Sequence, residues 1–207
     1  AARLSPEEKV GQLFLITFDG LEIGEESEVY KLISEYSVGG VVLKSGNENF
    51  ADPDDVLQNT YDLISELQTI EWNTGSELGD ESSDIGFANE YIPLFIGISQ
   101  PGGSFPYDQM FGGITSTPSQ MAIGATWNIS IAKEVGELIG SELKTLGFNL
   151  FFGPSLDVLD IVYSEGEENL GVRTFGGDPY WVGEIGAAYI EGFHEGSNNK
   201  IAVIVKN

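Results

Sequence analysis

The amino-acid sequence predicts an α/β fold built around a parallel sheet. Short apolar runs alternate with longer stretches whose apolar residues recur at helical spacing, which is typical of βαβ units. The short runs are continuously apolar, as expected for strands that are covered on both faces. Two architectures remain open. One is the first five strands of a TIM-type (β/α)8 barrel, which needs ~250 residues. The other is an open five-stranded doubly wound sheet.

The first predicted element is a short helix. Ser5-Pro6-Glu7-Glu8 has the residues of a capping box, with proline at the first helical position. The apolar run over residues 12–18 is too short for a good helix and predicts a buried strand. Apolar residues at helical spacing over 29–36 predict a second helix, and residues 41–43 the second strand.

The third predicted helix begins after Asp52-Pro53, and a solvated loop follows it over residues 72–90 because periodicity is lost there. The run over residues 92–98 predicts the third strand, and an irregular stretch extends to about residue 128. The buried stripe expected on the third helix consists of Val56, Thr60, Leu63, Leu67 and Ile70.

The remaining chain predicts two further helix–strand pairs. A helix over 131–146 ends at Gly147 and leads into a strand over 150–152. A helix between Asp178 and Gly196 leads into a fifth strand over 201–205.

The composition excludes several classes of function. The 207 residues carry a net charge of −24 with only nine basic residues, so nucleic acid and anionic membranes are not expected partners. The absence of cysteine excludes disulfides and thiolate chemistry, and a single histidine argues against a histidine-rich metal centre. A neutral small molecule or saccharide is the ligand that best fits the negative electrostatic field of this chain. The chain begins with Ala-Ala-Arg and is interpreted as a processed or excised piece.

Candidate site residues follow from the predicted strand ends. In both architectures, ligands bind at the carboxyl ends of the parallel strands. The polar residues expected at those ends are Asp19, Lys44, Ser99, Gln100, Asp157 and Lys206. Three aromatic residues after the third strand, Phe105, Tyr107 and Trp127, are hypothesised to stack on a sugar face.

Several motifs occur together in a recognisable order. They are Leu4–Phe14, Val38–Leu43, Pro93–Gly103, Leu146–Val158 and Arg173–Gly176. In this order and spacing they resemble the N-terminal domain of glycoside hydrolase family 3, in its β-N-acetylhexosaminidase-like branch. The resemblance covers essentially all of residues 1–207 and implies one domain, the incomplete N-terminal portion of a barrel. It also implies retaining hydrolysis of β-linked glycosides, of the β-N-acetylhexosaminidase or β-glucosidase type, without metal or organic cofactor.

The resemblance assigns substrate-binding roles to four residues, and the strand-end position adds Asp157 as a fifth candidate. Arg173 occupies the arginine position of the family's Arg-x-Phe-Gly motif, and Lys206 with Asn207 matches its Lys-His pair. Ser99 stands where the family places a sugar-binding aspartate, and Asp157 follows the fourth strand. The nucleophilic aspartate and the acid/base group fall beyond Asn207. The chain is therefore expected to contain no catalytic residue and to be inactive alone.

The expected partners are a saccharide substrate and the remainder of the barrel, as continuing sequence or a second chain. The replacements at Ser99 and Asn207 motivate an alternative function, a non-catalytic saccharide-binding or scaffold homologue. A third hypothesis is an unrelated flavodoxin-like open sheet. The acidity of the chain and its expected saccharide substrate favour a secreted or cell-envelope location.

Overall fold

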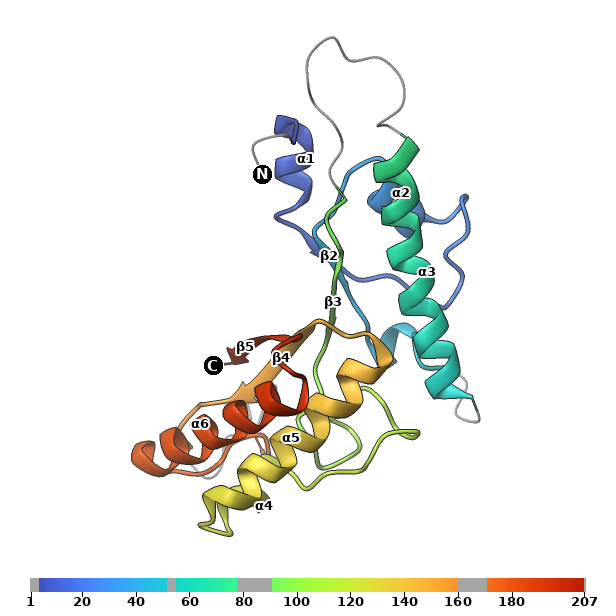
Figure 1. Ribbon diagram of the computed structural model, residues 1–207. Coiled ribbons are helices and arrows are strands. Elements are labelled where there is room, and N and C mark those ends of the chain that lie inside the picture. The colour runs from blue at the N-terminus through green and yellow to red at the C-terminus, as the bar shows by residue number, and fades with distance from the viewer. Residues whose placement is uncertain (1–3, 52–54, 78–90, 160–170, 207) are drawn as a thin grey trace. The chain divides into compact units, whose positions relative to one another are not determined.

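The computed structural model describes residues 4–51, 55–77, 91–159 and 171–206. The chain divides into two compact units, Ala1–Gly97 (unit 1) and Ile98–Asn207 (unit 2) (Figure 1). Among the described residues, no helix combines the length and apolar character that crossing a membrane requires. The prediction of one domain over residues 1–207 stays a prediction.

Unit 1 is a three-stranded parallel arrangement with helices between the strands. Its elements are α1 (Pro6–Gly11), β1 (Leu15–Ile16), α2 (Glu28–Ser34), β2 (Gly40–Val42), the 3-10 helix η1 (Ser45–Asn47), α3 (Val56–Glu77) and β3 (Phe95–Ile98), whose last residue belongs to unit 2. Strand β2 lies in the middle: Gly40 pairs with Leu15 of β1 and with Phe95 of β3. A flavodoxin-like order would place the first strand between the second and the third, so this order contradicts that hypothesis.

The local signals of unit 1 are confirmed. Ser5 and Glu8 form the expected capping box, in which each side chain accepts a hydrogen bond from the other residue's amide. The amphipathic pattern of the third helix also holds, because its whole predicted stripe is buried. Those side chains form the face that α3 contributes to the apolar interior of this unit. The predicted cap at residues 52–54 lies outside the described residues.

The prediction of a buried first strand over 12–18 is wrong in both length and burial. Regular pairing is confined to Leu15–Ile16, and the Leu13, Phe14 and Leu15 side chains are 81%, 56% and 41% exposed. The reason is position in the sheet. Strand β1 pairs only with β2 in this unit, so the apolar run has a neighbour on one side only.

Unit 2 packs two long helices beside a parallel strand pair. Its elements are α4 (Gln120–Gly124), α5 (Ile129–Leu146), β4 (Leu150–Ser155), α6 (Pro179–Gly196) and β5 (Ala202–Lys206). Strands β4 and β5 pair in parallel, with Leu150 opposite Ala202. Helix α4 was not predicted, because it spans five residues and begins with a serine cap inside a stretch without periodicity.

Helices α5 and α6 lie side by side (Figure 1) and approach closely through glycine. A Cβ atom on Gly136 or Gly140 of α5 would lie 2.1 Å or 2.3 Å from a carbonyl oxygen of α6. The same holds in reverse for Gly192 and Gly196, at 2.0 Å and 1.9 Å from carbonyl oxygens of α5. The glycines are part of the buried face of α5. Gly136 and Gly140 are buried, whereas Ile131 near the start of the helix is only half-buried.

Candidate functional site

The candidate site of unit 2 is centred on a contact between Ser99 and Lys206. The Lys206 Nζ donates a hydrogen bond of 2.9 Å to the Ser99 Oγ, across a sequence separation of 107 residues. The Ser99 hydroxyl in turn donates to the Phe152 carbonyl oxygen of β4 at 3.2 Å. Because Ser99 directly follows β3 and Lys206 ends β5, the contact lies at the carboxyl ends of the strands, as predicted.

Lys206 is positioned by an irregularity in the β4–β5 pairing. Phe152 lies opposite Ile204 and Ser155 lies opposite Lys206, so three steps along β4 match two steps along β5. One extra residue in β4 changes which face the following side chains share. The Leu156 amide then donates to the Lys206 carbonyl oxygen at 3.1 Å and holds the end of β5 against the β4 terminus.

Asp157 lies immediately beyond this junction, in a turn that its own backbone helps to close. The Ser155 hydroxyl donates to the Asp157 Oδ2 at 3.0 Å, which orients the carboxylate. The buried Thr174 hydroxyl donates to the Asp157 carbonyl oxygen at 2.5 Å. The structure therefore brings Asp157 beside the segment that carries Arg173.

Arg173 is placed by its neighbours on both sides. Its guanidinium carbon lies 5.3 Å from the centroid of the Tyr107 ring, a cation–π geometry. The buried Gln120 amide joins this segment to β4 when its nitrogen faces the Arg173 carbonyl oxygen and its oxygen accepts from the Ser155 amide at 3.1 Å. The Val172 carbonyl oxygen accepts from the Met121 amide at 3.0 Å. Helix α4 thus supports the arginine.

The loop after β3 contains two buried polar side chains that organise it. Gln100 accepts from the Gln109 and Met110 amides at 3.0 and 3.1 Å and donates to the Met110 carbonyl oxygen at 3.1 Å. Asp108 accepts from the Gly102 and Ser104 amides at 2.7 and 2.8 Å. Burial raises the pKa of the Asp108 carboxyl, and these two amide hydrogen bonds oppose that rise.

Sequence reasoning missed Asp108 and misjudged Gln100. Gln100 was nominated for a strand-end site, but its hydrogen bonds go to the backbone of residues 109–110. Asp108 lies nine residues beyond Ser99 in a stretch without periodicity, so no strand-end rule points to it. The one available signal was Gly102-Gly103, since a tight turn that follows a strand exposes amides for a nearby carboxylate.

The aromatic residues near this loop divide into separate groups. Phe105 is 80% exposed and lies 5.9 Å from Phe111 between ring centroids. Tyr107 lies against Arg173. Trp127 packs edge-on against Trp181 of α6 at 5.2 Å, between the starts of two helices. The three residues hypothesised to stack on a sugar therefore do not form one platform.

The other nominated residues belong to unit 1 or lie outside the described residues. Asp19 and Lys44 belong to unit 1, where Asp19 accepts from the Asn47 side chain. The Lys44 amide donates to the buried Asn49 side chain at 2.9 Å. Asn207 lies outside the described residues.

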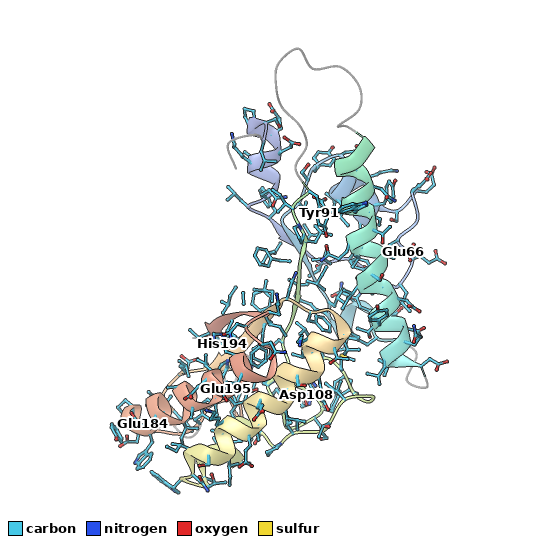
Figure 2. The ribbon with its side chains drawn as sticks, viewed as in Figure 1. Glu66, Tyr91, Asp108, Glu184, His194 and Glu195 are labelled. Carbon is cyan, nitrogen blue, oxygen red and sulfur yellow. The ribbon has the colours of Figure 1, made fainter. Side chains whose placement is uncertain are left out.

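The described residues offer no alternative centre of metal or histidine chemistry. No group of three or more histidine and acidic side chains in those parts of the chain is arranged to hold a metal ion. His194, the single histidine, lies on α6 beside Glu195 (Figure 2). What the site presents is a lysine, an arginine, a serine and a carboxylate, which suits hydrogen bonding to a hydroxylated ligand.

The chain is similar in sequence to proteins whose names are those of glycosidases. A beta-hexosaminidase A of Pseudoalteromonas piscicida is 30% identical over 169 residues, which cover 80% of this chain and 24% of that protein. A beta-N-acetylglucosaminidase/beta-glucosidase of Cellulomonas fimi is 27% identical over 191 residues, which cover 92% of this chain and 27% of that protein. The chain thus spans about a quarter of the length of these two relatives.

A solved structure confirms the predicted fold. The glycoside hydrolase family 3 beta-N-acetylglucosaminidase from Paenibacillus sp. str. FPU-7 matches 99% of this chain and 33% of its own, with a TM-score of 0.78 and 33% identity. The fold is accordingly that of the N-terminal part of a TIM-type barrel. Residues 5–206 also match the profile of the glycosyl hydrolase family 3 N-terminal domain. With nearly its whole length covered by that profile, the chain belongs to glycoside hydrolase family 3 as an N-terminal domain.

Proposed function

We propose that the protein containing this domain hydrolyses β-linked glycosides, with terminal N-acetyl-β-hexosaminides as its main substrates. The observation that carries the proposal is the Ser99–Lys206 contact, which gathers polar groups at the strand ends of a family 3 domain. The names of the relatives support the substrate class, since they include beta-hexosaminidase and beta-N-acetylglucosaminidase.

In this proposal the described residues bind and orient the sugar. The planar guanidinium of Arg173 can donate to two hydroxyl oxygens at once, and Tyr107 limits its movement. The Lys206 ammonium donates to hydroxyl oxygens near Ser99, whose hydroxyl can both donate and accept. Asp157, oriented by Ser155, accepts from a sugar hydroxyl.

The bond-breaking groups are proposed to come from outside residues 1–207. The resemblance implies an aspartate nucleophile that forms a glycosyl-enzyme and a second group that acts first as acid and then as base. These groups would belong to the remainder of the barrel, as continuing sequence or a second chain. The proposal also keeps Asn207 as a sugar-binding residue and a secreted or cell-envelope location.

The test uses the full-length protein. We expect it to release 4-nitrophenol from 4-nitrophenyl N-acetyl-β-D-glucosaminide faster than from the matching β-D-glucoside, with the β anomer as the first product. Arg173→Lys and Lys206→Met should each lower kcat/KM by about 10- to 100-fold. The first removes the second of two parallel donors, and the second removes a charged donor.

The matched control is Lys200→Met. Lys200 lies in the turn after α6, where its amide donates to the Ser197 carbonyl oxygen. That variant removes the same charge away from the site and should leave kcat/KM unchanged. Saccharide binding without turnover would instead support the non-catalytic homologue. The absence of both binding and turnover would refute both functions.

A further inference from the structure

The loop that carries Ser99 is built from backbone that only glycine adopts easily. Gly102 and Gly103 have φ values of 82° and 89°, in the left-handed region. A Cβ atom on Gly102 would lie 2.4 Å from the Pro118 carbonyl oxygen, and the Gly103 amide donates to the Thr117 carbonyl oxygen at 2.9 Å. The turn is therefore tight and lies close against a second segment.

Asp108 supplies the buried anchor of this turn. Its side chain is 3% exposed, and its two carboxylate oxygens accept separately from the Gly102 and Ser104 amides, at 2.7 and 2.8 Å. A buried carboxylate is costly unless its oxygens are hydrogen-bonded. Two charge-assisted hydrogen bonds to amides of the same turn offset that cost and restrict the movement of the loop.

Gln100 fixes the other end of the same loop. Its side chain makes three hydrogen bonds to the backbone of Gln109 and Met110, immediately after Asp108. Residues 100–104 are thereby tied at two points to residues 108–110. Ser99 directly precedes the tied segment, so the position of its hydroxyl depends on where that segment is held.

We propose that Asp108 is a positioning residue, which holds the Gly102–Ser104 turn so that the Ser99 hydroxyl stays in contact with Lys206 in the sugar-binding arrangement. This inference rests on the proposed function. A carboxylate suits the role because both of its oxygens accept. An asparagine would keep one acceptor and would turn an NH2 group toward the second amide.

A double-mutant cycle in the full-length protein tests whether Asp108 acts through Ser99. We expect Asp108→Asn to lower kcat/KM for 4-nitrophenyl N-acetyl-β-D-glucosaminide about 10-fold, mainly through a higher KM, as for a mid-range coupling between neighbours. In a Ser99→Ala background the same change should cost less than about twofold. Equal losses in both backgrounds would show that Asp108 does not work through Ser99 and would overturn the proposal.

Gln68→Ala is the control for general destabilisation. Gln68 of α3 makes two hydrogen bonds with the Leu94 backbone, at the opposite end of β3 from Ser99. The Gln68→Ala variant therefore loses a pair of hydrogen bonds at the end of the strand that is remote from Ser99. We expect a lower denaturation midpoint with an unchanged KM.

A ligand-free measurement separates this inference from the proposed function. Hydrogen exchange of a peptide that contains the Gly102 and Ser104 amides should become at least about 10-fold faster in Asp108→Asn. Unchanged exchange would overturn the anchoring role even if the protein is an active glycosidase. Faster exchange in a protein that neither binds nor cleaves a saccharide would support the anchoring role of Asp108. It would refute both the proposed function and the positioning role.

Discussion

Substitution of Gly192 by alanine should destabilise the α5–α6 pair despite the higher helix propensity of alanine. The added Cβ atom would lie 2.0 Å from the Lys133 carbonyl oxygen, where ordinary contact needs at least 3.4 Å. The obstacle is backbone, which cannot rotate aside as a side chain can. The two helices must therefore separate locally by about 1.4 Å, the difference between these two distances.

The expected magnitude follows from two opposing effects. Alanine in a helix interior gains roughly 0.5–1 kcal/mol over glycine. Forcing an extra carbon into a well-packed contact costs typically about 1–3 kcal/mol, and more when backbone must shift. With a packing cost near the upper end of that range, about 3 kcal/mol, the propensity gain leaves an expected net loss of about 2 kcal/mol in local stability.

Gly183→Ala is the matched control on the same helix. No atom lies within 4 Å of its added Cβ, so only the propensity gain applies and stability should rise by about 0.5–1 kcal/mol. Hydrogen exchange of peptides from α5 and α6 in the full-length protein measures both variants. If Gly192→Ala protects these helices as well as Gly183→Ala does, close glycine packing is not what holds them together.

Three further predictions concern single side chains. Burial raises the pKa of Glu71 to about 7, and Glu8 nearby adds to the rise. Because this value exceeds the ordinary 4.5, the stability that Glu71 contributes is present below pH 4.5 and is lost as the pH rises through 7. Denaturation midpoints of Glu71→Gln should therefore fall less than those of the parent between pH 5 and 8, and parallel curves would contradict this. Thr60 has a buried hydroxyl with no hydrogen-bond partner among the described residues, so Thr60→Val should leave the melting temperature equal or higher, and a lower value would reveal a missed partner. Asp178 caps α6 through the Tyr180 and Trp181 amides, so Asp178→Ala should cost about 1 kcal/mol by denaturant titration, whereas Asp178→Asn should cost much less.

The elements whose signals are local were predictable from the sequence. The capping box of α1, the buried stripe of α3 and the Asp178 cap of α6 each depend on residues within a few positions of one another. The parallel alternation followed from the order of apolar runs. Family membership followed from five motifs in series, although each motif alone is weak.

The features that failed depend on neighbours that are distant in sequence. The apolar run at 12–18 predicts burial, but its exposure depends on which strands lie beside β1. The glycine contacts between α5 and α6 were not predicted, because a hydrophobic pattern assigns no packing role to glycine.

The same division applies to the candidate site. The sequence alone determined which residue types stand at the strand ends, because strand boundaries and motifs are local: Ser99, Asp157, Arg173 and Lys206 were all named from them. Only the tertiary structure decided that Lys206 contacts Ser99, since that contact depends on one extra residue in the β4–β5 register. It also decided that Gln100 and Asp108 hold the backbone of the loop. A buried polar side chain takes its role from the backbone groups left without partners around it, and chain folding alone brings those groups within reach.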